Sequence, residues 1–232
     1  MKKLFIIANW KSNKTSLETK DWFQGISNFQ FPISNKEIIL CPAFTLLSNL
    51  KSYIVNPPAG EAGHKSSLKL GAQDISPFES GAYTGEVSAK QIKEFADYVI
   101  VGHSERRQHF HETEEIIIKK LEMAQKYQIK PIFCISDISQ IHNSSFIIPK
   151  SNIIIAYEPL SAIGSGQADT PENASNIASQ IKKIVGEIPV LYGGSVTSEN
   201  VASFTKTPYI DGVLVGNASL DAQEFLTIIA HA

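Results

Sequence analysis

Short runs of Ile, Val, Leu and Tyr recur along the chain, and most are followed by a stretch whose apolar residues have helical spacing. The runs are mostly continuous rather than alternating, which is typical of parallel strands buried on both faces. We predict eight strands, at residues 4–9, 37–41, 68–73, 98–102, 131–135, 153–158, 189–192 and 212–215. Eight strand–helix units without a linker predict a single α/β domain over residues 1–232, a closed (β/α)8 barrel. The alternative is a doubly wound open sheet, which does not need eight units of this regularity.

Residues suited to capping mark several helix starts. We expect helices to begin at Ser16 with Glu18, at Thr170-Pro171-Glu172 and at Thr197-Ser198-Glu199. The fifth connection, residues 136–151, has little helical periodicity. We therefore predict that helix five is short or missing.

Composition and charge narrow the possible classes of protein. Apolar residues make up 43% and charged residues 19%, as in globular domains. A net charge of -2 gives no general field that would attract nucleic acid or an anionic membrane, so neither is an expected partner. The apolar run from Leu4 to Ala8 is too short for a signal peptide, and no run approaches a membrane span. Cys41 and Cys134 have no CxxC spacing and are interpreted as reduced core thiols, with a disulfide as the weaker alternative, so we expect a cytoplasmic protein.

Polar residues stand where the predicted strands end. In an α/β barrel the carboxyl ends of all strands meet at one mouth, where functional residues gather. Asn9 and Lys11 follow the first strand, His103 follows the fourth and Glu158 ends the sixth. Each alone has an ordinary explanation, as an ion-paired carboxylate, a structural histidine or a surface lysine. Their arrival at one rim, together with the turn Gly193-Gly194, predicts an active site there.

A loop of small residues with an apolar tip follows the sixth strand, and it is either a plain surface connection or a lid that excludes water from the site. Its residues are Pro159, Leu160, Ser161, Ala162, Ile163, Gly164, Ser165 and Gly166. Backbone N–H groups at four positions are suited to surround one phosphate, helped by a helix amino terminus after strand eight. These positions are Gly164, Ser195, Gly216 and Asn217.

Six motifs spread from the first strand to the last form a specific combined pattern. They are Asn9-Trp10-Lys11, Gly102-His103-Ser104-Glu105-Arg106-Arg107, Ala156-Tyr157-Glu158-Pro159, Ala162-Ile163-Gly164-Ser165-Gly166, Tyr192-Gly193-Gly194-Ser195 and Leu214-Val215-Gly216. The set resembles the triosephosphate isomerase family. The resemblance implies a TIM barrel that interconverts dihydroxyacetone phosphate and D-glyceraldehyde 3-phosphate through an enediolate, in glycolysis and gluconeogenesis. It implies a cytoplasmic homodimer, and no metal or organic cofactor.

The same resemblance assigns roles to individual residues. Glu158 would remove a proton from one carbon and return it to the next. His103 would act as a neutral imidazole that polarises the carbonyl, because a helix amino terminus disfavours a second positive charge. Lys11 would supply positive charge to the phosphate and the enediolate, and Asn9 would donate a hydrogen bond. Glu105 would organise the site from beside His103.

The lid and its supports include departures from the family pattern. Tyr192 and Ser195 are expected to hold the closed lid by hydrogen bonds. Ser161 stands where the family usually has Trp, and Asp137 stands where it usually has Glu. Because those two places touch in the family, we hypothesise a smaller hydrogen bond between Ser161 and Asp137. Asn217 replaces a usual second Gly, and it still offers an N–H to phosphate.

The connection from Asp74 to Glu86 is long and rich in turn residues. It is either a loose surface loop or, as the resemblance implies, the arm that inserts into a second subunit. In the latter case Thr84 would lie near Asn9 and Lys11 of the partner.

Other functions remain open. His109 and His111 with Glu112 could indicate a metal site, but a third partner at ligand spacing is missing, so we predict exposed positions at a helix start. A different phosphate-binding barrel, or a barrel kept as a binding surface without activity, are the alternatives to an isomerase. The intact set of Lys11, His103 and Glu158 argues against both.

Overall fold

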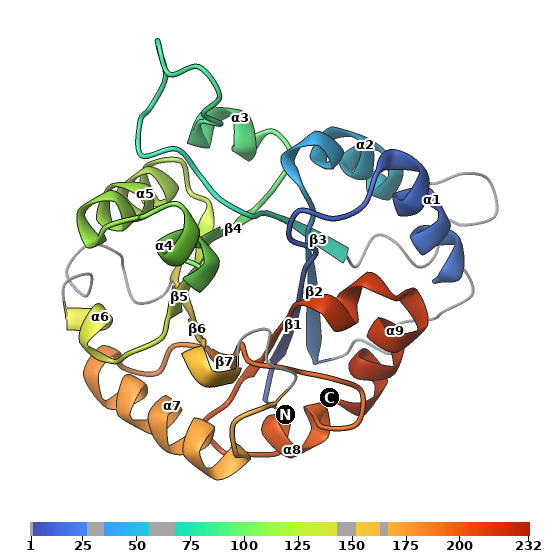
Figure 1. The fold of residues 1–232 in the computed structure, drawn as a ribbon, viewed down its shortest axis with the longest axis vertical. Helices are drawn as coiled ribbons and strands as arrows, with labels where there is room; N and C mark the ends of the chain where they lie inside the picture. The colour runs from blue at the N-terminus through green and yellow to red at the C-terminus, as the bar shows by residue number, and fades with distance from the viewer. Residues whose placement is uncertain (1, 27–34, 56–67, 143–151, 163–166) are drawn as a thin grey trace.

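Eight parallel strands close into a barrel in the order of the sequence (Figure 1). The computed structural model describes residues 2–26, 35–55, 68–142, 152–162 and 167–232. The strands are β1 Leu4–Asn9, β2 Lys36–Cys41, β3 Leu68–Ala72, β4 Tyr98–Val101, β5 Lys130–Ile135, β6 Ile154–Tyr157, β7 Val190–Tyr192 and β8 Gly212–Val215. Phe5 of β1 pairs with Gly212 of β8, so the first strand lies beside the last. The predicted barrel is confirmed, and each strand bound lies within one residue of its expected place.

Helices form a ring around the strands (Figure 1). They are α1 Ser16–Gly25, α2 Phe44–Val55, α3 Ala89–Lys93, α4 Ser104–His109, α5 Glu114–Lys126, α6 Ser139–His142, α7 Pro171–Val185, α8 Val201–Thr205 and α9 Ala222–His231, with 3-10 helices η2 Leu160–Ala162 and η3 Asn217–Leu220. The fifth connection contains α6, which is four residues long. The prediction of a short fifth helix is confirmed for the part that the structure describes, and residues 143–151 lie outside it.

Two helix starts agree with the sequence signals and one does not. Ser16 is the first residue of α1, although the capping side chain is that of Thr15, which forms a capping box with Glu18. Thr170 caps α7, with Pro171 in its first turn. The prediction for residues 197–199 was wrong, because α8 begins at Val201. Glu224 of α9 accepts both the amide and the hydroxyl of Ser198, which holds this segment in a turn before the helix.

Alternation along the strands separates two apolar layers. One cluster fills the barrel and includes Phe5, Ile7, Ile154 and Ala156, while their neighbours pack outward against the helices. Burying one Ile or Leu side chain stabilises the fold by about 1.5–3 kcal/mol, so both layers contribute substantially. Cys41 and Cys134 belong to the inner cluster as free thiols, as expected.

The inward face of two strands continues from apolar residues into polar ones. On β1 the inward positions Phe5 and Ile7 lead to Asn9, and after β6 the positions Ile154 and Ala156 lead to Glu158. Because side chains alternate with a period of two, both polar groups are directed toward the barrel axis at its carboxyl mouth.

The segment between β3 and α3 extends beyond the ring of helices (Figure 1). Within it, the rings of Phe78 and Tyr83 stack at a centroid distance of 4.0 Å, although each side chain is about two-fifths exposed. Glu79 accepts hydrogen bonds from Lys126 and Tyr127 on the far end of α5. The segment is therefore an ordered projection that still presents aromatic surface to solvent. In the described part of the chain, no helix is both long and apolar enough to cross a membrane.

Candidate active site

A cavity of about 280 Å³ opens at the carboxyl mouth of the barrel. Its lining residues come from the ends of several strands: Asn9, Lys11, His103, Glu158, Gly193, Gly194, Ser195, Val196, Thr197, Leu214, Gly216, Asn217 and Ala218. The structure thus brings together seven of the nine residues predicted to be catalytic or phosphate-binding. Gly164 lies outside the described residues. Glu105 is not a lining residue, but it pairs with Lys11, which is one.

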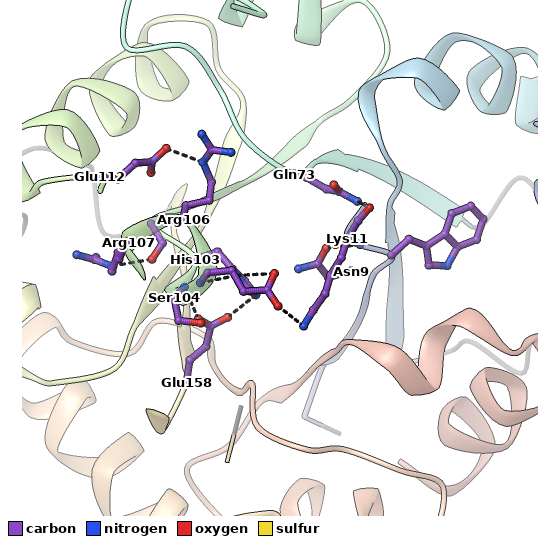
Figure 2. Close-up of polar contacts among 12 residues, drawn as sticks. Asn9, Lys11, Gln73, His103, Ser104, Arg106, Arg107, Glu112 and Glu158 are labelled. Carbon is purple, nitrogen blue, oxygen red and sulfur yellow. Dashed lines mark hydrogen bonds and ion pairs between the residues drawn. The ribbon is translucent and has the colours of Figure 1, made fainter. Parts of the chain in front are cut away.

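The carboxylate of Glu158 is almost completely buried, with 1% of the residue exposed. Its Oε2 atom accepts the backbone N–H of Ser104 at 2.9 Å, and its Oε1 atom lies 3.2 Å from Nε2 of His103 (Figure 2). Gly193 packs closely against the Glu158 side chain: a Cβ atom at this position would lie only 3.0 Å from Cγ of Glu158. The acid group is therefore held by directional contacts at the edge of the cavity.

His103 is the N-cap of α4, and both nitrogens of its ring have polar contacts. Its Nδ1 atom accepts the backbone N–H of Glu105 at 3.2 Å, which requires a lone pair on that nitrogen. With Nδ1 as the acceptor, Nε2 is the nitrogen left to donate, and it faces Glu158. Strand β4 and the first turn of α4 hold the imidazole in this orientation.

The ammonium group of Lys11 lies 2.5 Å from Oε1 of Glu105, across the cavity from Glu158 (Figure 2). Lys11 has a φ of 53°, a conformation that costs about 1 kcal/mol or more in a residue with a side chain. Two contacts hold it there: Gln73 donates to the Lys11 carbonyl at 2.8 Å, and the Lys11 amide donates to Oδ1 of Asn9 at 3.0 Å. Since its oxygen is used in this way, Asn9 presents its amide nitrogen as the group that can donate to a ligand.

The turn after β8 forms the wall next to Lys11. Gly216, Asn217 and Ala218 line the cavity there, and Asn217 begins the 3-10 helix η3. The first N–H groups of a helix have no intrahelical acceptor, which makes this turn suited to an anion. A Cβ atom at Gly216 would lie 3.3 Å from Cε of Lys11, so glycine lets the lysine stem approach the turn.

The described part of the predicted lid comprises Pro159 and η2. Leu160 is 69% exposed and forms the apolar surface expected of the loop, whereas Ala162 is buried. The hydroxyl of Ser195 donates to the carbonyl of Ala162 at 2.7 Å. The phenol oxygen of Tyr192 accepts the amide of Asp169 at 2.8 Å, so it contacts the chain after the lid. Residues 163–166, the predicted lid residues Ile163, Gly164, Ser165 and Gly166, lie outside the described residues.

Asp137 has a different contact from the one hypothesised. Its carboxylate accepts the amide and the hydroxyl of Ser139, at 2.8 and 2.6 Å, at the start of α6. These bonds hold the pKa of Asp137 below its usual value. In the part of the chain that the structure describes, no hydrogen bond joins Asp137 to Ser161. Both of the bonds from Ser139 go to Oδ1 of Asp137.

Glu112, which was considered as a metal ligand together with His109 and His111, belongs to a network of ion pairs. Glu112 accepts Nε of Arg106 at 2.5 Å and also the ammonium of Lys120. A carboxylate that neutralises two cations is a poor additional ligand for a third.

Two contributors to the site were not singled out from the sequence. Ser104 holds Glu158 by a backbone N–H, which no side-chain pattern reveals, although its place directly after His103 was a signal. Gln73 is a polar residue directly after β3, and the rule that polar strand ends face the mouth could have found it.

A closed (β/α)8 barrel with a buried carboxylate, an imidazole and an ammonium group around one cavity defines a barrel enzyme built for proton transfer on a small substrate. A sequence model of triosephosphate isomerase matches residues 4–232. The chain is 37% identical over 255 residues to the triosephosphate isomerase of Dehalococcoides mccartyi, covering 100% of this chain and 98% of that protein. It is also 37% identical to the triosephosphate isomerases of a Nostoc species and of Mesomycoplasma hyopneumoniae, with both partners covered completely. The chain belongs to the triosephosphate isomerase family.

Proposed function

We propose that Glu158, His103 and Lys11 carry out the isomerisation that defines the family. The chain is an aldose–ketose isomerase that interconverts dihydroxyacetone phosphate and D-glyceraldehyde 3-phosphate, a reaction of glycolysis.

Glu158 is the base that moves the proton. A carboxylate oxygen at the cavity edge removes a proton from the carbon next to the carbonyl and returns it to the neighbouring carbon. The N–H of Ser104 and the ring of His103 orient the two oxygens, so little reorganisation is needed when substrate binds.

His103, Lys11 and Asn9 stabilise the enediolate. The Nε2–H of a neutral imidazole donates to the carbonyl oxygen, and the neutral state at a helix amino terminus is the arrangement known for this family. The Lys11 ammonium places a positive charge opposite the oxygens where negative charge develops, and the Asn9 amide adds a donor. Glu105 keeps Lys11 in position through its 2.5 Å ion pair and orients His103 through its backbone N–H.

The phosphate end of the substrate is assigned to the turns after β7 and β8. Backbone N–H groups of Ser195, Gly216 and Asn217, with Gly164 from the lid, would bind it. Closure of the lid over this end would exclude water, which protects an enediolate from losing phosphate. The Ser195 contact with Ala162 supports this role, because it joins the phosphate turn to the lid.

The observation that carries the proposal is the meeting of Glu158, His103 and Lys11 around one cavity. Glu158→Gln should keep the fold and lower kcat by about 10²–10⁴-fold, because an amide cannot accept the proton. Glu187→Gln is the matched control, since that side chain is 90% exposed and far from the cavity residues. A coupled assay with glyceraldehyde 3-phosphate measures both. Near-normal turnover of the Glu158 variant would mean that the base is misassigned.

We also propose a cytoplasmic homodimer joined through the segment from Asp74 to Glu86. The exposed stack of Phe78 and Tyr83 supports it, since ordered aromatic surface on a projection is typical of an interface. Thr84 would then approach Asn9 and Lys11 of the partner. In analytical ultracentrifugation the protein should sediment as a dimer and Thr84→Arg as a monomer. A monomeric unmodified protein with full activity would contradict the arrangement.

A further inference from the structure

Two indole groups converge on a single carbonyl oxygen. Nε1 of Trp10 donates to the carbonyl of Ser219 at 3.2 Å, and Nε1 of Trp22 donates to the same oxygen at 3.1 Å. Trp10 follows β1, whereas Trp22 lies on α1, so two separate elements hold one point of η3. A carbonyl oxygen has two lone pairs, and both are therefore used.

Ser219 connects the two indole hydrogen bonds to the turn that lines the cavity. Its amide and its hydroxyl both donate to the carbonyl of Gly216, at 2.9 and 2.7 Å, and the residue is fully buried. The turn Gly216-Asn217-Ala218 is consequently closed by the bonds from Ser219 to Gly216, and the two indoles hold it through the Ser219 carbonyl. The backbone of this turn lines the cavity, while the anchoring bonds lie outside it.

The hydrogen bond from Trp10 to Ser219 also connects the turn to Lys11. Trp10 is the residue directly before Lys11, so its bond to Ser219 couples the backbone that carries the ammonium to the turn. The close approach of the lysine stem to Gly216 shows how little room separates the two. A small shift of η3 would alter the distance between the cation and the N–H groups beside it.

The indoles are themselves tightly constrained. Their ring centroids are 5.1 Å apart in an edge-to-face arrangement, and Trp22 makes a second such contact with Phe23 at 5.2 Å. Trp10 is fully buried, and Trp22 is 4% exposed. Packing of this kind leaves the indole N–H groups little freedom, so they act as fixed donors.

We propose that Trp10 and Trp22 position the phosphate-binding turn through the carbonyl of Ser219, which makes Trp22 on α1 a positioning residue for substrate binding. This inference rests on the assignment of Gly216 and Asn217 to the phosphate end. Trp22 anchors the turn assigned to the phosphate, whereas Glu158 and His103 follow β6 and β4, so we expect its main effect on the affinity for the phosphate group.

Trp22→Phe tests the role because it keeps an aromatic ring in the cluster and removes the N–H. The KM for glyceraldehyde 3-phosphate and the inhibition constant of inorganic phosphate should rise together by about fivefold, the size expected for one lost hydrogen bond. The kcat should stay within about twofold. Turnover of D-glyceraldehyde, which has no phosphate, should not change.

Leu50→Ala is the control for a loss of buried apolar volume, because Leu50 is buried on α2 and no hydrogen bond or ring contact of the described residues joins it to Trp10, Trp22 or Ser219. It should lower Tm while leaving both constants unchanged. Ser219→Ala removes the hydroxyl bond to the Gly216 carbonyl, and it tests the same positioning role if Trp22→Phe does not fold. The KM and the inhibition constant of phosphate should both rise as in Trp22→Phe.

The outcomes separate the two assignments. If Gly216→Ala weakens inorganic phosphate binding but Trp22→Phe and Ser219→Ala do not, the positioning role is wrong and the phosphate site stands. If Gly216→Ala leaves phosphate binding unchanged, the phosphate assignment fails, and this inference fails with it. A Trp22→Phe variant that loses turnover of both substrates equally would show a purely structural role.

Discussion

Replacing Gly194 with Ala should disrupt the support of the lid, because the site has no room for a methyl group. A Cβ atom there would lie 2.1 Å from the phenol oxygen of Tyr192 and 2.5 Å from its Cζ atom. Tyr192 has no simple way to move aside. It is fully buried, and its ring stacks on Phe204 at a centroid distance of 3.9 Å. Its phenol oxygen also accepts the amide of Asp169.

The expected cost follows from these contacts. Overfilling a packed site costs about 1–3 kcal/mol. Losing the hydrogen bond between Tyr192 and Asp169 adds about 1 kcal/mol. Gly194→Ala should therefore lower the free energy of unfolding by about 2–4 kcal/mol, and it should raise KM because the end of the lid loses its anchor.

A double-mutant cycle measured by urea unfolding separates the collision from other effects. In the Tyr192→Leu background the shorter side chain does not reach position 194, so adding Gly194→Ala should cost less than about 0.5 kcal/mol. All four proteins should be compared at one protein concentration, because the proposed dimerisation would contribute to apparent stability. Equal costs of Gly194→Ala in both backgrounds would refute the steric explanation.

Two further predictions concern buried polar groups. Lys120→Met should lower the free energy of unfolding by about 3–5 kcal/mol. Lys120 donates to Asp74 at 2.6 Å and to Glu112, so both carboxylates would lose a buried cation. A loss below about 1 kcal/mol, measured by thermal unfolding, would contradict this. Burial raises the pKa of Tyr192 to about 12 from 10.0, so the unfolded phenol loses its proton first and stability should fall as pH rises through this interval. Urea unfolding at about pH 9 and about pH 11 measures the fall, and it should be smaller in Tyr192→Phe.

The barrel could be predicted because its signals are local and repeated. Continuous apolar runs such as those of β1 and β6 indicate strands buried on both faces, and eight of them leave few alternatives. The positions of Asn9 and Glu158 follow from the same alternation, since each is two residues beyond an inward apolar side chain. The convergence of the site on one mouth is thus a consequence of topology.

The remaining features depend on contacts between segments far apart in the sequence. Ser198 does not start a helix because Glu224 of α9 binds it, and Asp137 turns to Ser139 instead of to the lid. The role of Ser104 rests on a backbone N–H, a group that every residue except proline carries. No local pattern distinguishes these outcomes from their alternatives.

The buried carboxylates differ in the groups that hold them, and this difference bears on the role proposed for Glu158. Within the described residues, Glu112 is paired with Lys120 and Arg106, and Asp211 is paired with Lys182 at 2.7 Å. Such pairing compensates part of the loss of hydration of a buried charge. In the same residues, neither lysine nor arginine pairs with Glu158, which is held by the backbone N–H of Ser104 and the ring of His103. These contacts orient the carboxylate at the cavity without a lysine or arginine partner that a substrate would have to displace, which fits the base proposed for this reaction.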